Sequence, residues 1–308
     1  MSGRDRRVLV IVGPCSLHCE ESAVSYAERL ASLQRQCESE CLLVMRAYIE
    51  KPRTNVGWKG MLYDPDLSGS HNLEKGIRMS RHLMIRLLET GVPLATEALS
   101  PLAHHYLDDL VSWVAIGART TESQVHREMA SSLPCAVGFK NGTDGHLGGA
   151  VNAIKAAGSG HTYLGMDRNG RVGVCTSAGN ASTQLVLRGG KSGSNYDADS
   201  VASACQSLAA AGLNPGIVID CSHENSGKDH TKQAVALSAV AEQIASGQDA
   251  IRGVMLESHL ESGQQAISGP LKYGVSITDA CIGWEETESL IDTLCRAKAV
   301  SLPAQQAC

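Results

Sequence analysis

Residues 111–127 read VSWVAIGARTTESQVHR. The first six residues form a short apolar run that is typical of a buried strand, and the helical pattern after them can be capped by Thr121 or Ser123. Between the two, Gly117 and Ala118 leave the backbone uncovered, and Arg119 offers a planar fork of N–H donors. The stretch therefore predicts a strand, a turn and a helix, with a loop that suits an oxyanion. A tight turn with a solvated arginine would explain the same residues.

The same alternation recurs along the 308 residues. Strands are expected at 8–12, 42–47, 93–95, 111–116, 135–139, 184–187, 216–220 and 251–256. Helices are expected at 20–34, 73–88, 102–110, 121–129, 147–157, 197–211, 231–246 and 285–299. The sixth unit is irregular, with another strand at 162–166 and a glycine-rich insertion that predicts a hairpin near 171–174. No composition break interrupts the pattern, so we predict one α/β domain, a (β/α)8 TIM barrel over residues 1–308.

A doubly wound sheet is the main alternative fold. It would usually show a glycine-rich fingerprint after the first strand, and Gly13-Pro14-Cys15-Ser16 is not one.

Composition excludes several functions. The net charge is -5 without a compensating basic run, which argues against a nucleic-acid partner. No apolar run approaches the ~18 residues that a membrane span needs, so no membrane partner is expected. The eleven cysteines are an odd number without a framework of spacings, which favours reduced thiols and a cytoplasmic protein.

A chemically reactive or charged residue follows each expected strand. In a barrel these positions converge on one mouth, where active sites are built, whereas unrelated loops would end several strands in Ser, Asn or Gly. The eight residues, in strand order, are Cys15, Arg46, Glu97, Arg119, Lys140, Arg188, His223 and Glu257.

Cations dominate one part of this set. Lys51 and Arg53 in the loop KPRT at 51–54 add to Arg46, Arg119, Lys140 and Arg188. Crowded like charges are costly without anions, and Arg forks fit phosphate and carboxylate with two bonds at once. We therefore expect ligands that carry several negative charges and more than one phosphate.

The other part is Cys15, His223 and Glu257, which Asp279 could complete. A thiolate, an imidazole and two carboxylates suit one divalent transition ion, Mn, Fe, Co or Zn, better than Mg or Ca. The alternatives are a core thiol at Cys15, a capping side chain at His223 and the N-cap of a turn at Asp279.

Long motifs in fixed order resemble one family. They are GPCS at 13–16, KPRT at 51–54, GWKG at 57–60, GARTTES at 117–123, GFKNGTDG at 138–145, LRGG at 187–190, DCSH at 220–223, ESH at 257–259 and TDACIGW at 278–284. From Leu9 to about Trp284 the chain is similar to microbial type I 3-deoxy-D-arabino-heptulosonate 7-phosphate (DAHP) synthases. The resemblance implies a metal-dependent (β/α)8 transferase that condenses phosphoenolpyruvate with erythrose 4-phosphate. That reaction opens the shikimate pathway to chorismate and the aromatic amino acids.

The resemblance also implies residue roles. Cys15, His223, Glu257 and Asp279 would hold the metal, and Lys51, Glu97 and His223 would be catalytic. The substrate-binding residues would be Arg46, Lys51, Pro52, Arg53, Thr54, Glu97, Gly117, Ala118, Arg119, Lys140, Arg188, His223 and Asp279. The expected assembly is a homodimer or a homotetramer.

Departures from the family pattern bear on regulation. The chain begins almost directly on its first expected strand, without the N-terminal regulatory extension of feedback-regulated members. His104 and Pro134 stand where a Pro and a Ser commonly line the effector pocket, and Met166-Asp167-Arg168-Asn169 replaces the usual start of the inserted hairpin. We expect an enzyme insensitive to aromatic amino acids.

Other functions stay open at the level of sequence. They are an octulosonate-phosphate synthase, an amino-sugar variant that uses imino-erythrose phosphate, and a noncatalytic metabolite-binding barrel. The last would be expected to lose a ligand or a charged strand-end residue, and none is missing.

Overall fold

Eight parallel strands close into a barrel in the computed structural model, which describes residues 5–167 and 169–305. The order around the ring is β1-β10-β9-β8-β5-β4-β3-β2. Their bounds are β1 Val8–Gly13, β2 Cys41–Arg46, β3 Leu94–Glu97, β4 Trp113–Ile116, β5 Ala136–Lys140, β8 Thr183–Leu187, β9 Ile217–Asp220 and β10 Ile251–Glu257. The predicted single-domain (β/α)8 barrel is confirmed, and the doubly wound alternative is wrong because the first and last strands pair.

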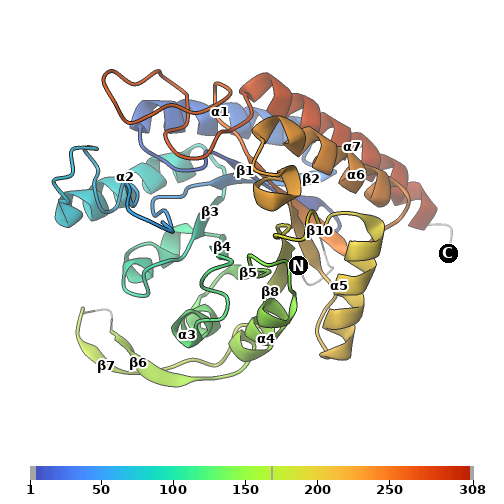
Figure 1. Cartoon of the computed structure of the whole chain (residues 1–308), viewed down its shortest axis with the longest axis horizontal. Coiled ribbons are helices and arrows are strands. Elements are labelled where there is room, and N and C mark those ends of the chain that lie inside the picture. Colours follow the sequence, from blue (N-terminus) through green and yellow to red (C-terminus); the bar gives the residue numbers. More distant parts are fainter. Residues whose placement is uncertain (1–4, 168, 306–308) are drawn as a thin grey trace.

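Helices surround the ring (Figure 1). They are α1 Glu20–Gln36, α2 Leu73–Glu89, α3 Gln124–Ser132, α4 Gly148–Ala157, α5 Ala198–Ala210, α6 Gln233–Ala245 and α7 Trp284–Gln305. Four short 3₁₀ turns join them, η1 Ala103–Tyr106, η2 Asp108–Leu110, η3 His223–Ser226 and η4 His230–Lys232. Within the described residues no helix combines the length and the apolar character of a membrane span.

Burial explains why the apolar runs became strands. All six residues of β1 are buried, as expected of a parallel strand that is covered on both faces. One apolar layer lies between strands and helices, and a second fills the barrel interior. The inner layer consists of Leu9, Ile11, Val44, Tyr48, Ala95, Trp113, Ala115, Val186, Val218 and Met255.

One predicted helix is wrong. The segment 102–110 forms the two 3₁₀ turns η1 and η2, because Leu107 between them has φ -139° and ψ -14°, which an α-helix does not tolerate. Leu107 is buried there. The apolar spacing therefore reports the burial of Ala103 and Leu107 and not a continuous helix.

The inserted hairpin is larger than the sequence predicted. β6 Thr162–Met166 pairs antiparallel with β7 Val172–Thr176, outside the barrel sheet. Figure 1 shows this hairpin projecting beyond α3 and α4. Residues 162–166 thus belong to the insertion, and β8 is the sixth barrel strand. Arg168, within the tetrapeptide at 166–169, lies outside the described residues.

Candidate active site

The carboxyl ends of the strands open into a cleft of about 740 Å³. The expected site residues that line it are Arg46, Lys51, Pro52, Arg53, Thr54, Glu97, Gly117, Ala118, Arg119, Lys140, Arg188, His223, Glu257 and Asp279. Cys15 is fully buried, and its thiol lies 3.5 Å from Asp279 Oδ2. Residues from all eight strand ends therefore meet at one mouth.

A thiol and two carboxylates form a compact group at the cleft. Ligand atoms of Cys15, Glu257 and Asp279 all lie within 4.8 Å of one another. The ring closure brings them together, since Gly13 on β1 is the register partner of Glu257 on β10. One soft donor and two hard donors fit a divalent transition ion, so these residues could hold the metal that the sequence predicted.

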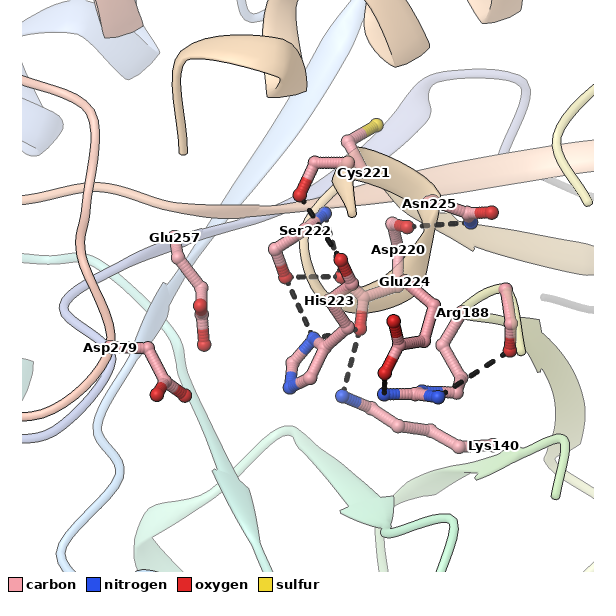
Figure 2. Close-up of polar contacts among 12 residues, drawn as sticks. Lys140, Arg188, Asp220, Cys221, Ser222, His223, Glu224, Asn225, Glu257 and Asp279 are labelled. Carbon is pink, nitrogen blue, oxygen red and sulfur yellow. Dashed lines mark hydrogen bonds and ion pairs between the residues drawn. The ribbon is translucent and has the colours of Figure 1, made fainter. Parts of the chain in front are cut away.

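His223 lies on the same cleft but is not part of that compact group. Its Nδ1 is 3.0 Å from Asp220 Oδ2 and 2.8 Å from the hydroxyl of Ser222. These contacts leave Nε2 as the nitrogen that faces the cleft, and Figure 2 shows the ring turned toward the side of Glu257 and Asp279. A carboxylate on one ring nitrogen is the usual support for a histidine that binds a metal through the other.

The side chain of Lys51 lies next to the Cys15 thiol. Its ammonium lies 3.1 Å from Cys15 Sγ and 3.1 Å from the Cys15 carbonyl oxygen. Burial opposes the charge of Lys51, but Cys15, Glu257 and Asp279 outweigh it and raise its pKa. Burial, followed by the negative charge of Glu257, raises the pKa of the Cys15 thiol to about 11. Lys51 is thus a persistent cation beside the candidate metal ligands.

A buried ion pair connects the cation cluster to the metal-ligand group. Arg46, fully buried, donates from Nη2 to Glu257 Oε1 at 2.9 Å and stacks over the Tyr48 ring at 4.0 Å. Its Nη1 is also buried and finds no hydrogen-bond partner among the described residues. An unsatisfied guanidinium nitrogen beside a cleft is well placed to receive an anionic ligand.

Sequence reasoning missed Asp220, the last residue of β9. It is fully buried, its Oδ2 accepts from Lys140 Nζ at 2.8 Å and lies 3.0 Å from His223 Nδ1, and its Oδ1 accepts from the backbone N–H and the hydroxyl of Ser222. Burial would raise its pKa, but Lys140 and His223 hold the pKa well below its usual range. Figure 2 shows Asp220 between the lysine and the imidazole. The missed signal was its place at a strand end in the DCSH motif.

The sequence suggested that the cations of the cleft need anionic ligands as their counter-charges, but several of them already have a carboxylate of the protein beside them. Arg46 and Lys140 are paired with buried carboxylates, and Arg188 Nη2 lies 3.8 Å from Glu224 Oε1. Two further cations, Lys191 and Lys228, also line the cleft and were not predicted. The anionic ligand is therefore expected beside Arg119, which is exposed and lines the cleft, and near the buried Arg46 nitrogen that has no hydrogen-bond partner among the described residues.

Gly117 is explained by a close approach. A Cβ at this position would collide with the Glu97 carboxylate oxygen. Glu97 is buried at the end of β3 and lines the cleft, so the glycine lets a carboxylate pack onto the loop of Arg119.

The start of α3 is not capped as expected. Ser123 is the N-cap residue, but its side chain makes no capping hydrogen bond. Thr121 instead donates to the carbonyls of Gly117 and Lys140.

The fold and the cleft define a (β/α)8 barrel protein with a cationic site beside a thiol and carboxylate group. The comparisons with known proteins agree: residues 1–292 match the family described as DAHP synthetase I. The chain belongs to the DAHP synthetase I family.

Individual relatives cover nearly the whole chain. A "Phospho-2-dehydro-3-deoxyheptonate aldolase, Trp-sensitive" from Enterobacter agglomerans is 51% identical over 303 residues, 98% of this chain and 86% of the relative. A Tyr-sensitive aldolase of the same name from Salmonella typhimurium (strain LT2) is 48% identical over 294 residues, 94% of this chain and 82% of the relative. The solved structure of phospho-2-dehydro-3-deoxyheptonate aldolase from Francisella tularensis SCHU S4 superposes with a TM-score of 0.95 at 44% identity, covering 97% of this chain and 88% of that one.

Proposed function

We propose that this chain is a metal-dependent DAHP synthase that joins phosphoenolpyruvate, D-erythrose 4-phosphate and water to give DAHP and phosphate. The observation that carries the proposal is one cleft in which a cation cluster meets the Cys15, Glu257 and Asp279 group. Family membership supports the reaction class. The product would enter the shikimate pathway toward chorismate and the aromatic amino acids.

Each part of the cleft has a role in this proposal. Arg119, Lys140 and Arg188, with the free nitrogen of Arg46, would bind the phosphate and carboxylate of phosphoenolpyruvate. Pro52, Arg53 and Thr54 line the outer part of the cleft and would receive the phosphate of the aldose. Gly117 and Ala118 would offer backbone to the first substrate.

Cys15, His223, Glu257 and Asp279 would hold one divalent ion, Mn, Fe, Co or Zn. When bound, such an ion supplies a Lewis acid that polarises the aldehyde. Asp220 would orient His223 through Nδ1.

The bond-forming steps need proton control. The methylene carbon of phosphoenolpyruvate attacks the aldehyde carbon, and Lys51, which stays protonated at neutral pH, donates a proton to the new hydroxyl. Water then adds to the former enol carbon, near Glu97, and the proton that this water loses replaces the one that Lys51 donated. The hemiketal phosphate collapses with carbon–oxygen cleavage and releases inorganic phosphate.

The test measures phosphate release and heptulosonate formation together, before and after chelation and metal return. Activity should fall on chelation and return with Mn, Fe, Co or Zn. Arabinose 5-phosphate in place of erythrose 4-phosphate tests the octulosonate alternative, and imino-erythrose phosphate tests the amino-sugar variant. Full turnover in chelator would remove the metal from the proposal, and no turnover with any aldose would favour the noncatalytic barrel.

We also propose a cytoplasmic enzyme that is insensitive to aromatic amino acids and acts as a homodimer or homotetramer. The ten cysteines that the structure describes are free thiols, which supports a reducing compartment.

His104 lines a small cavity at one of the positions expected in an effector pocket, which supports the proposed insensitivity to aromatic amino acids. Strong inhibition by micromolar phenylalanine, tyrosine or tryptophan would contradict it, and sedimentation analysis would give the assembly.

A further inference from the structure

A second cluster of metal-binding side chains lies outside the cleft described above. His104 and His105 on η1 and Asp108 on η2 each offer one ligand atom, and these three atoms lie within 4.8 Å of one another. The two imidazole rings are 4.0 Å apart between centroids, tilted by 36°. Leu107, which has a non-helical backbone conformation, separates η1 from η2, and Asp108 at the start of η2 lies close to the two histidines.

The state of His104 favours metal binding over a structural role. Its Nδ1 is buried and has no hydrogen-bond partner among the described residues. A buried nitrogen without a partner is costly unless a ligand satisfies it.

Charge and access are compatible with a cation at this place. One positive group, Arg81 on α2, lies beside η1 and η2. It donates to the Tyr106 carbonyl oxygen at 2.6 Å and to the Asp109 carboxylate at 2.7 and 2.6 Å. Asp109 forms the ion pair with Arg81, and the charge of Asp108 also acts on Arg81, so two carboxylates face one cation there. His105 is exposed, so an ion can reach the cluster directly from solvent.

We propose that His104, His105 and Asp108 form a second site for a divalent transition ion such as Zn²⁺ or Co²⁺, separate from the Cys15 group. Two nitrogens and one carboxylate oxygen leave a fourth position for water in a tetrahedral shell. This donor set is poor for Mg²⁺ and Ca²⁺, which prefer oxygen ligands.

The position of the site connects it to the cleft. His104 and Asp108 line a small cavity whose other walls include Glu50 and Glu97. Glu97 lines the substrate cleft on its other side. A bound ion would fix η1 and η2 directly behind this carboxylate.

Titration with Co²⁺ tests the proposal on the full chain after chelator treatment, and it needs no turnover. A cobalt ion bound by Cys15 gives a thiolate-to-metal charge-transfer band, whereas one bound by imidazole and carboxylate does not. We expect two ions per wild-type chain. His105→Asn should bind one and keep the band, and Cys15→Ser should bind one and lose the band.

His82→Asn is the matched control, because His82 is an exposed histidine on α2 outside the cluster, and it should still bind two ions. Circular dichroism confirms that each variant is folded, and His105 is exposed enough to be replaced without a packing defect. The proposal is overturned if wild type binds only one ion, if His105→Asn still binds two, or if Cys15→Ser binds none.

Discussion

The barrel interior has two layers that are equally buried and chemically opposite. The lower layer, which includes Trp113 and Met255, is almost entirely apolar. The upper layer, Arg46, Lys140, Asp220 and Glu257, is charged although none of the four exceeds 4% exposure. Charges survive at this depth because each has an opposite partner within 3.0 Å. We therefore expect the lower layer to stabilise the fold and the upper layer to serve the proposed reaction.

The largest expected effect is on catalysis at the upper layer. Cys15→Ala removes the thiol donor, and loss of several kcal/mol of transition-state stabilisation corresponds to a fall in kcat on the order of a thousandfold. Stability should change little by comparison. Phosphate release measures the first effect and urea denaturation the second. Cys205→Ala on α5 is the control and should keep its activity.

The lower layer should give the opposite result. Trp113→Ala leaves a cavity and removes the bond from its indole nitrogen to Gln184, so unfolding should become easier by about 3–5 kcal/mol. If urea denaturation showed no decrease in the free energy of unfolding, the apolar layer would not be what stabilises the fold. Leu164→Ala, on the exposed hairpin strand β6, should change stability by less than about 0.5 kcal/mol.

The pairing of charges is tested by breaking one pair. Arg46→Met leaves Glu257 buried without its partner and should cost about 3 kcal/mol of unfolding free energy, together with activity. Adding Glu257→Leu should restore much of the stability and none of the activity. A double variant no more stable than the single one would mean that the upper layer also supports the fold.

Arg119 lies at the exposed edge of the same layer, so a smaller effect is expected. Arg119→Lys keeps the charge but loses the planar fork, and KM for phosphoenolpyruvate should rise roughly tenfold to a hundredfold. Steady-state kinetics at saturating erythrose 4-phosphate measures it. An unchanged KM would remove Arg119 from the binding site.

The smallest effect concerns pH. Burial raises the pKa of Glu50, which accepts from the Tyr63 hydroxyl at 3.0 Å. A raised carboxyl pKa stabilises the fold below the ordinary value of about 4.3, and this contribution disappears as pH rises through the folded-state pKa. Glu50→Gln should flatten that part of the stability curve. Denaturation midpoints from pH 4 to pH 7 compare the two proteins, with Glu74→Gln on the surface of α2 as control.

Particular residues show what the sequence could predict. Uninterrupted apolar runs such as 8–12 were recognised because burial on both faces leaves no alternation to misread. β3 was placed at 93–95 and lies at Leu94–Glu97, because its buried Thr96 and Glu97 look like loop residues. The cleft could be predicted from the reactive and charged residues that follow the strands, because a closed parallel barrel brings the carboxyl ends of its strands together. The role of Asp220 and the ion pairs of the buried cations could not be predicted, because the spacing of residues along the sequence does not show which side chains pair across different strands.

The ring closes by pairing β1 with β10, so Cys15 comes from the first strand while Glu257 and Asp279 come from the last part of the chain. During synthesis on the ribosome, the thiol emerges more than two hundred residues before its carboxylate partners. The nascent polypeptide therefore cannot assemble this donor set until translation is nearly complete.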